Sequence, residues 1–268
     1  MGIDVDTTVL VTTGNGMFGG ALIRELAGTP DINVRALVRD ASRFTVSAPN
    51  VTVVVGDMDK PETLTAAVEG ATHIFLVTPM DDHIVTRERA VTDAAVASAS
   101  NPHILKIHGA VEHRGDHLSS MHLASIDYIK ASGLNWSLIS PNSVMETSLL
   151  GFAGTVKMDA IFGMSGHGKV GFVALEDIAR ATATVIKQGL GGNGDNFLLT
   201  GPRAIDLYEV AEAMSTAVGR DVTYYDMPEE AFANVLLQEK IYPDRDSLET
   251  NVLCHLRAWG RGDASLVT

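Results

Sequence analysis

The chain has 268 residues, and its 33 acidic residues outnumber its 20 lysines and arginines, which gives a formal net charge of −13. This balance excludes a protein that binds nucleic acid through a strongly basic surface. The hydrophobic fraction of 46% excludes general disorder, and a single cysteine, Cys254, excludes an internal disulfide.

The first residues, Met1 to Asp6, carry acidic side chains where a secretory signal carries basic ones. No apolar run reaches the roughly 18 residues that a membrane span needs. Position six is Asp6, whereas a myristoylation motif that begins at Gly2 needs Ser or Thr there. We therefore expect a cytoplasmic protein with no membrane partner and no nucleic-acid partner.

Short β-branched runs alternate with longer helical patterns along the first half of the chain. The predicted strands span 9–12, 34–38, 51–55, 73–77, 104–107 and 135–140, and the predicted helices span 17–27, 61–69, 84–99 and 117–131. This alternation predicts an α/β protein with a Rossmann-type doubly wound parallel sheet.

Beyond Pro141 the alternation loosens into a stretch rich in Gly and Met, 151–171, which we expect to be a substrate loop. Strands at 170–174, 196–200 and 221–225 and helices at 176–187, 206–218, 229–239 and 245–259 follow. The sequence thus predicts a dinucleotide-binding core over 1–140, to which 170–200 returns. Residues 141–169 and 201–268 are predicted to form a small C-terminal α/β lobe that binds substrate.

A GxGxxG sequence, Gly14 to Gly19, lies between the first predicted strand and helix. Glycines in this context allow a tight turn and let the backbone approach a pyrophosphate, whose charge the helix N-terminal amides favour. An ordinary Gly-rich connection is the alternative. The predicted cofactor-binding residues are Thr13, Gly14, Asn15, Gly16, Met17, Phe18, Gly19, Arg39, Arg43, Asp57, Met58, Val77, Thr78 and Pro79.

The end of the second predicted strand carries Arg39 and Asp40, and Arg43 follows closely. A carboxylate at this position holds the ribose 2′-hydroxyl of NAD, whereas an arginine accommodates the 2′-phosphate of NADP. Arg39 and then Arg43 favour NADP(H), although a surface arginine paired with Asp40 is the alternative. Asp57 is a candidate for the adenine amine, or it caps the helix that follows.

Several segments together resemble the NmrA-like group of atypical short-chain dehydrogenases, over nearly the whole chain. They are Val11 to Gly19, Ala36 to Asp40, Gly56 to Met58, Ala131 to Trp136, Ser140 to Asn142, Gly171 to Val173, Asp177 to Ala179 and Leu199 to Pro202. The resemblance implies a Rossmann core and a bound NADP(H).

This chain departs from the pattern of that group at several positions. The TGxxGxxG loop of the group has its first Gly at the position of Thr13. The group also has an SGLxxTxxRP segment. In this chain Ser137 stands at the Thr position of that segment and Ser140 stands at the Arg position.

Short-chain dehydrogenases commonly use a YxxxK pair, in which Lys lowers the pKa of Tyr so that Tyr protonates the alkoxide. No tyrosine of this chain has a lysine four residues later. The resemblance implies two kinds of protein without this pair: reductases that deliver hydride to an electrophilic acceptor, and NADP-sensing regulators without chemistry.

Five of the nine histidines lie between His103 and His122, where an open α/β sheet presents its carboxyl-end crevice. Histidine titrates near neutrality and can donate a proton. The candidates for catalysis are His122 and His108, with Ser120 as a hydrogen-bond donor. Solvated loop histidines explain the cluster equally well.

His113 and His117 have the i, i+4 spacing of a helical zinc pair, with Glu112 and Asp116 nearby. Gly115 lies between the two histidines, and no third ligand has a fixed spacing. We therefore expect no metal.

Apolar side chains in and near the Gly- and Met-rich stretch suit an adaptable lining for a hydrophobic small molecule. The predicted pocket residues are Met80, Pro141, Asn142, Met145, Phe152, Phe162 and Met164. Ordinary core packing is the alternative.

The sequence favours an NADP(H)-dependent reductase that transfers hydride to a hydrophobic small molecule, at a quinone, enone, ketone or iminium-like carbon. A homodimer is left open as its oligomeric state. Two other hypotheses remain open. One is a redox sensor that passes its cofactor state to a regulatory protein partner, and the other is a cofactor-bound isomerase or lyase.

Overall fold

The computed structural model describes residues 7–111, 115 and 117–268. The chain divides into two compact units. The first comprises Met1–His108, Met121–Ser140 and Leu175–Phe197, and the second comprises Gly109–Ser120, Pro141–Ala174 and Leu198–Thr268. The assignment of substrate binding to the second unit stays a prediction.

A seven-stranded sheet has the order β3-β2-β1-β4-β5-β6-β8. Its strands are β1 (Thr7–Val11), β2 (Ile32–Val38), β3 (Val51–Val55), β4 (His73–Leu76), β5 (His103–Ile107), β6 (Trp136–Pro141) and β8 (Asp195–Leu199). All neighbours from β3 to β6 pair in parallel. The strand order reverses between β1 and β4, and in such sheets ligands bind at the carboxyl ends beside this point.

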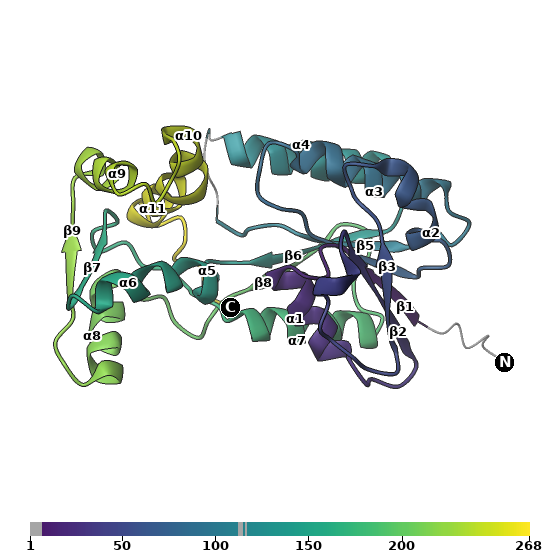
Figure 1. The fold of residues 1–268 in the computed structure, drawn as a ribbon, viewed down its shortest axis with the longest axis horizontal. Coiled ribbons are helices and arrows are strands. Elements are labelled where there is room, and N and C mark those ends of the chain that lie inside the picture. Colours follow the sequence, from purple (N-terminus) through teal and green to yellow (C-terminus); the bar gives the residue numbers. More distant parts are fainter. Residues whose placement is uncertain (1–6, 112–114, 116) are drawn as a thin grey trace. The chain divides into compact units, whose positions relative to one another are not determined.

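Helices cover both faces of this sheet, which confirms the doubly wound fold (Figure 1). Helices α1 (Met17–Leu26) and α7 (Leu175–Lys187) lie on one face, and α2 (Thr65–Val68), α3 (Ile84–Ala97) and α4 (His117–Ala131) lie on the other. The reason is visible in α7, whose buried residues Ile178, Thr182 and Val185 recur every three or four positions and form one apolar stripe.

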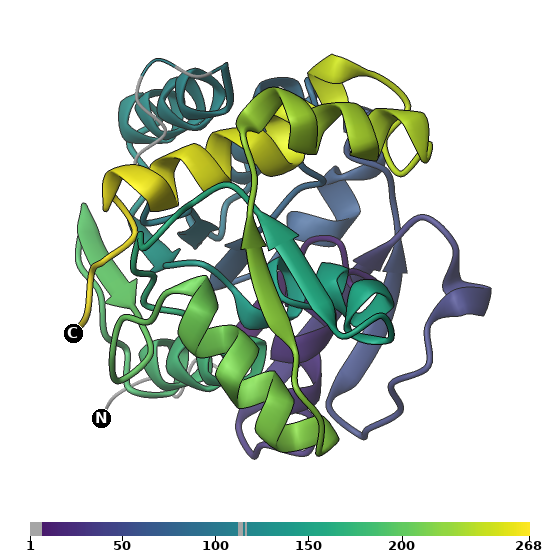
Figure 2. The same ribbon diagram turned by 90° about the vertical axis from the view of Figure 1, so that its left-hand side faces the viewer.

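In the second unit, β7 (Ala160–Gly163) pairs in parallel with β9 (Thr223–Asp226). Around this pair lie α8 (Leu207–Val218), α9 (Glu229–Gln238) and α11 (Cys254–Arg261) (Figure 2). The shorter helices are α5 (Met145–Ser148), α6 (Ala153–Val156) and α10 (Arg245–Leu248). The buried rings of Phe172 and Trp259 meet edge to face in its core, 5.3 Å between centroids.

The C-terminal tail is tied into the second unit. The side-chain amide of the buried Asn142 donates to the carbonyls of Ala264, at 2.9 Å, and Leu266, at 3.2 Å. The Gly171 N–H also donates to the Ala264 carbonyl, and a Cβ at position 171 would lie 2.2 Å from the Leu266 oxygen. Residue 171 must therefore be glycine for the tail to lie where it does.

The structure corrects four predicted elements. The predicted strand at 170–174 is reduced to isolated bridges, Val170 to Ile205 and Val144 to Val173, and the predicted loop at 151–171 contains α6 and β7. Strand β7 escapes detection because its four residues lie among glycines and its partner is about sixty positions away. The predicted helix at 61–69 is a 3-10 turn followed by the four-residue α2. The predicted helix at 245–259 is interrupted by a π-helical segment, Glu249–Leu253.

Candidate active site

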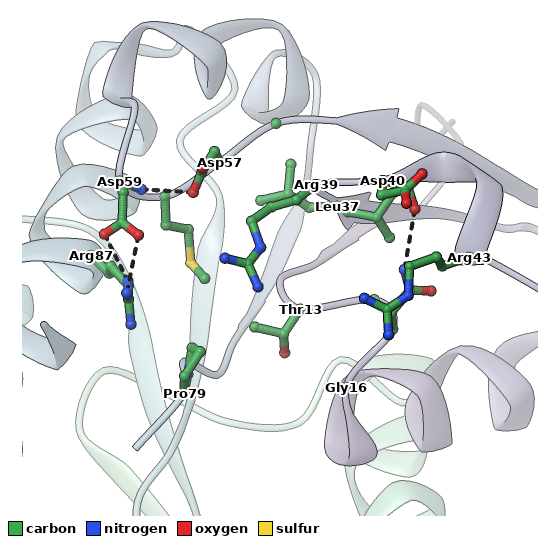
Figure 3. Close-up of a pocket in the computed structure, with 15 residues that line it drawn as sticks. Thr13, Gly16, Leu37, Arg39, Asp40, Arg43, Asp57, Asp59, Pro79 and Arg87 are labelled. Carbon is green, nitrogen blue, oxygen red and sulfur yellow. Dashed lines mark hydrogen bonds and ion pairs between the residues drawn. The ribbon is translucent and has the colours of Figure 1, made fainter. Parts of the chain in front are cut away.

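A pocket of about 300 Å³ opens at the carboxyl ends of β1 to β4 (Figure 3). Its walls come from the β1–α1 turn, the loops after β2, β3 and β4, and one side chain of α3. The lining residues are Thr13, Gly14, Asn15, Gly16, Leu37, Val38, Arg39, Asp40, Arg43, Gly56, Asp57, Met58, Asp59, Pro79 and Arg87.

The β1–α1 turn is the floor of this pocket. Thr13 has φ of +51°, in the left-handed region that favours glycine, and its carbonyl accepts the Gly16 N–H at 2.7 Å. A Cβ at Gly19 would lie 2.5 Å from the Thr13 oxygen, so α1 approaches β1 only because this residue is glycine. Helix α1 begins directly after Gly16 and has no acidic residue in its first turn. Its first amides can therefore bind an anion.

Two arginines extend into the pocket from the segment that follows β2 (Figure 3). In the described part of the chain, neither Arg39 nor Arg43 has a carboxylate within ion-pair distance. The carboxylate between them, Asp40, instead accepts from the Ser42 hydroxyl at 2.6 Å and from the Ser42 amide at 2.9 Å. These hydrogen bonds hold the pKa of Asp40 below its usual value. Among the described residues these two guanidiniums thus form no ion pair, although the Asp40 and Asp59 carboxylates interact electrostatically with Arg43 and Arg39 respectively.

The pocket wall opposite these arginines is held by Arg87 of α3. Its guanidinium binds Asp59 of the loop after β3 through two hydrogen bonds, at 2.8 and 3.0 Å. It also binds both oxygens of Asp81, in the loop after β4, at 2.8 Å each. The hydrogen bond to Asp59 is the largest cause of a raised pKa of Arg87, so the guanidinium stays charged. Arg87 therefore connects two loops of the pocket and is neutralised there.

Nine of the predicted cofactor residues line this pocket. They are Thr13, Gly14, Asn15, Gly16, Arg39, Arg43, Asp57, Met58 and Pro79. The others, Met17, Phe18, Gly19, Val77 and Thr78, are not among its lining residues. The prediction omitted the other six lining residues, which are Leu37, Val38, Asp40, Gly56, Asp59 and Arg87. Arg87 could have been predicted from the sequence, because it lies in the first turn of a predicted helix that follows the end of a predicted strand.

The two candidate histidines lie together in the first unit. His108 directly follows β5 and His122 lies on α4, and their rings form an edge-to-face pair with centroids 5.5 Å apart. Ser120 also lies on α4, where its residue is exposed and belongs to the second unit. The structure thus brings His108 and His122 together.

The predicted substrate residues are distributed over different environments. Met80 is exposed in the loop after β4, while Pro141 and Asn142 are buried. Phe152, Phe162 and Met164 pack against the core of the second unit. Met145 lines a separate pocket of about 430 Å³ in that unit, together with Glu146, Leu149, Leu150, Ala153, Val156 and Met214.

The metal alternative lies mostly outside the described residues, because Glu112, His113 and Asp116 are not among them. Within the described ranges, no three His, Cys, Asp or Glu side chains are arranged to hold a metal ion. None of the helices in these ranges combines the length and apolar character of a membrane span.

A doubly wound parallel sheet with a pocket at its β1–α1 turn defines an α/β protein of the Rossmann class. Within this class the chain belongs to the NmrA-like family, whose model matches residues 5–253. It is 30% identical over 219 residues to NAD(P)H azoreductase of Xenophilus azovorans, with 81% of this chain and 76% of that protein covered. It is 25% identical over 233 residues to quinone oxidoreductase 2 of Escherichia coli, covering 85% and 80%.

Solved structures share the fold. The NADPH-dependent quinone oxidoreductase of Escherichia coli, complexed with NADPH, superimposes with a TM-score of 0.84 at 22% identity, covering 96% of this chain and 90% of that one. Triphenylmethane reductase of a Citrobacter species, complexed with NADP(H), gives a TM-score of 0.84 at 22% identity, covering 97% and 92%.

Proposed function

We propose that this protein is an NADP(H)-dependent reductase that delivers hydride to a hydrophobic small molecule, such as a quinone, enone, ketone or iminium-like carbon. Membership of the NmrA-like family supports the proposal, as do relatives that are named as an NAD(P)H azoreductase and a quinone oxidoreductase. The observation that carries it is the pair of guanidiniums, Arg39 and Arg43, which line the pocket beside the β1–α1 turn without an ion pair among the described residues.

The pocket residues fit the charges of such a cofactor. Amides of the β1–α1 turn and the first turn of α1 would hold the pyrophosphate. Arg39 and Arg43 would hold the 2′-phosphate, since guanidinium groups bind phosphate with paired hydrogen bonds. Of the two Asp40 carboxylate oxygens, Oδ1 already accepts two hydrogen bonds from Ser42, so Oδ2 is the oxygen left to hold the 2′-hydroxyl of NAD. The two guanidiniums nevertheless make the phosphorylated cofactor the better match.

The bound cofactor would supply the hydride, and the chain itself would orient the acceptor and supply a proton where the product needs one. The His108 and His122 pair is the proposed proton source, with Ser120 as a hydrogen-bond donor and water as the competing source. Acceptors such as quinones already attract hydride, so they need less acid catalysis than a simple ketone. An NADP(H) reductase without a Tyr-Lys pair is consistent with acceptors of this kind.

The second unit offers an apolar surface for the acceptor. Six of the seven side chains of its 430 Å³ pocket are apolar, and Met145 and Met214 can adapt to differently shaped ligands. Glu146 contributes the one acidic group. We infer that the acceptor is hydrophobic, with aromatic rings as the best match.

The first test is calorimetric titration with NADPH, NADP⁺, NADH and NAD⁺. Wild type should bind the phosphorylated pair more tightly, and Arg39→Ala should weaken NADPH binding about 10- to 100-fold, the value of one to two charge-assisted hydrogen bonds. NADH binding should change little. Arg180→Ala is the control, because Arg180 pairs with Glu176 and Asp177 on the exposed face of α7. Absence of binding to every dinucleotide would refute the proposal.

The second test offers a panel of quinones, enones, azo compounds and cationic dyes and follows NADPH absorbance. Consumption that depends on the acceptor identifies a reductase. Tight NADPH binding without any turnover instead supports the redox-sensing regulator. Product that forms without a change in NADPH supports the isomerase or lyase.

A further inference from the structure

A buried ion pair lies behind the loop that follows β4. Lys106 of β5 is 1% exposed and Glu88 of α3 is 2% exposed, and the Lys106 ammonium lies 2.6 and 2.8 Å from the two carboxylate oxygens of Glu88. The same carboxylate accepts from the Ser125 hydroxyl of α4 and from the Thr78 hydroxyl, the latter at 3.1 Å. One carboxylate thus connects β5, two helices and the loop after β4.

Strand register explains why these groups meet. Lys106 is the direct partner of Leu76 in the β4–β5 pairing, so both side chains emerge on one face. Thr78 is two residues beyond Leu76 and continues on that face, because strand side chains alternate. This face packs against α3 and α4, from which Glu88 and Ser125 project.

Two other contacts fix the same loop. The buried Thr12 hydroxyl donates to the Val77 carbonyl at 2.7 Å and accepts the Val77 amide at 2.8 Å, which ties the start of the loop to β1. Asp81, at its end, is held by Arg87. Between Val77 and Asp81, the Glu88 carboxylate accepts the hydrogen bond from the Thr78 hydroxyl. The loop 77–81 is therefore anchored at three places around the position where parallel sheets bind ligands.

A buried ion pair is not by itself a source of net stability. Charge removed from water loses its hydration, and the attraction between two buried charges commonly only offsets this cost. A leucine and a methionine at these positions would fill a similar volume without that cost. The printed contacts of Glu88 give the pair a local consequence, which is that one carboxylate holds both the Thr78 hydroxyl and the Ser125 hydroxyl of α4.

We propose that Glu88, charged and held by Lys106, is a positioning residue for the reactive end of the bound cofactor, acting through Thr78. This inference rests on the proposed function, because it adds to the proposed cofactor contacts of Arg39 and Arg43 a second group of residues that positions the same cofactor. The arginines set the preference for the phosphorylated cofactor, whereas the Glu88 network sets the position of the loop 77–81.

The test uses the whole 268-residue chain, three variants and one control variant. Glu88→Leu/Lys106→Met removes both charges together, so no buried charge is left alone. Thr78→Val removes only the hydroxyl, and Thr78→Ser retains it. Asp127→Leu/Lys130→Met is the control, because it removes an ion pair of the same charge on α4 whose side chains are at least half exposed.

The first readout is hydrogen exchange of the free protein. Exchange of the hydrogen-bonded amides of this loop, those of Val77 and Asp81, should rise at least tenfold in the double variant and in Thr78→Val, with α1 amides unchanged. Thr78→Ser and the control should match wild type. A merely structural role would raise exchange throughout the sheet, so a uniform rise would overturn the inference.

The second readout is calorimetry with NADPH and NADH. Both affinities should fall about three- to tenfold in the double variant and in Thr78→Val, with the NADPH-to-NADH ratio unchanged. The inference would be overturned if the double variant and Thr78→Val showed the wild-type exchange rate in 77–81 and bound both cofactors within twofold of wild type. The proposed function would then remain intact. A wild type that binds no dinucleotide refutes the proposed function, while the exchange data still report whether Glu88 holds the loop.

Discussion

At the scale of single residues, five residues other than glycine have positive φ in the described part of the chain, and Thr13 is the one that lines the candidate active site. Thr13 adopts φ of +51° at the turn on which the pocket is built. For an L-residue other than glycine this conformation costs about 1–2 kcal/mol. The NmrA-like pattern has glycine here, so the conformation is dictated by the turn and not by threonine.

We therefore predict that Thr13→Gly raises the free energy of unfolding by up to about 1 kcal/mol, since release from the left-handed region exceeds the entropy cost of an added glycine. Urea denaturation measures it. Thr13→Ala keeps the strain and serves as the control. If both variants were equally stable, the turn would impose no cost on a side chain.

Lys106 carries the second residue-scale prediction. Lys106→Met alone leaves Glu88 charged and buried, which should cost about 3–5 kcal/mol of unfolding free energy. Glu88→Leu/Lys106→Met should recover most of that loss, because no charge is left unpaired. Chemical denaturation of wild type, both single variants and the double variant completes the cycle. Additive losses would contradict a direct pair.

The sequence predicted the parts of the site that depend on neighbouring residues. The turn from Gly14 to Gly19 and the arginine pair follow β1 and β2 directly, and the structure places most of these residues in one pocket. The Glu88 to Lys106 pair was not predicted, because the two residues are 18 positions apart and meet only when α3 packs on the face of the sheet that carries Lys106. A lysine inside the apolar run of a central strand was the available signal, since such strands are buried on both faces.

At the scale of elements, the distance between α1 and β1 depends on one glycine. Gly19→Ala would place a methyl group 2.5 Å from the Thr13 oxygen and 2.8 Å from the Thr12 oxygen, and both are backbone atoms that cannot give way. We expect a loss of about 1–3 kcal/mol, as for other overpacked interiors.

The neighbouring Gly20→Ala is its matched control. A Cβ there meets the flexible end of Arg24 at 3.3 Å, so alanine should be tolerated. It should even stabilise α1 by up to about 1 kcal/mol through helix propensity. Thermal unfolding of both variants is the measurement, and equal effects of the two substitutions would show that α1 tolerates a wider separation from β1.

The amino ends of β4 and β5 carry a stacked pair of histidines, His73 and His103, with ring centroids 5.8 Å apart. Burial, together with the nearby His103, lowers the pKa of His73 to about 4, and burial also lowers the pKa of His103. Both rings therefore stay neutral in the folded protein at pH values where an unfolded histidine is already charged.

The sign of the pH dependence follows. Above pH 6.5 neither state of His73 binds a proton, and stability is complete. As the pH falls from 6.5 towards 4, the unfolded state gains the proton first, so stability decreases, by up to about 3 kcal/mol for His73. His73→Gln should flatten this profile, whereas His83→Gln, at an exposed position, should not. Denaturation midpoints between pH 4 and 7 test it.

At the scale of the whole chain, the C-terminal tail closes the second unit. Ala264 is fully buried, and Asn142 binds two tail carbonyls across more than 120 residues. The tail is thus anchored, although its sequence shows no periodic pattern that would predict this.

We predict that Asn142→Ala and deletion of 264–268 each lower the unfolding free energy by at least about 1–3 kcal/mol, the cost of unsatisfied buried groups. Combining the two changes should lower the unfolding free energy little further, because both remove the same hydrogen bonds between Asn142 and the tail. Deletion of Thr268 alone removes an exposed contact to Thr200 and should cost less than about 0.5 kcal/mol. The unfolding transition of Trp259 reports the change.

The two units are also interleaved along the chain, which alternates between them in six segments. A growing polypeptide cannot finish its first unit when the first 140 residues have left the ribosome, because α7 and β8 are made only after much of the second unit. The second unit in turn waits for residues of the tail. Both units therefore depend on late synthesis, and the apolar faces of the early strands need protection until the chain is almost complete.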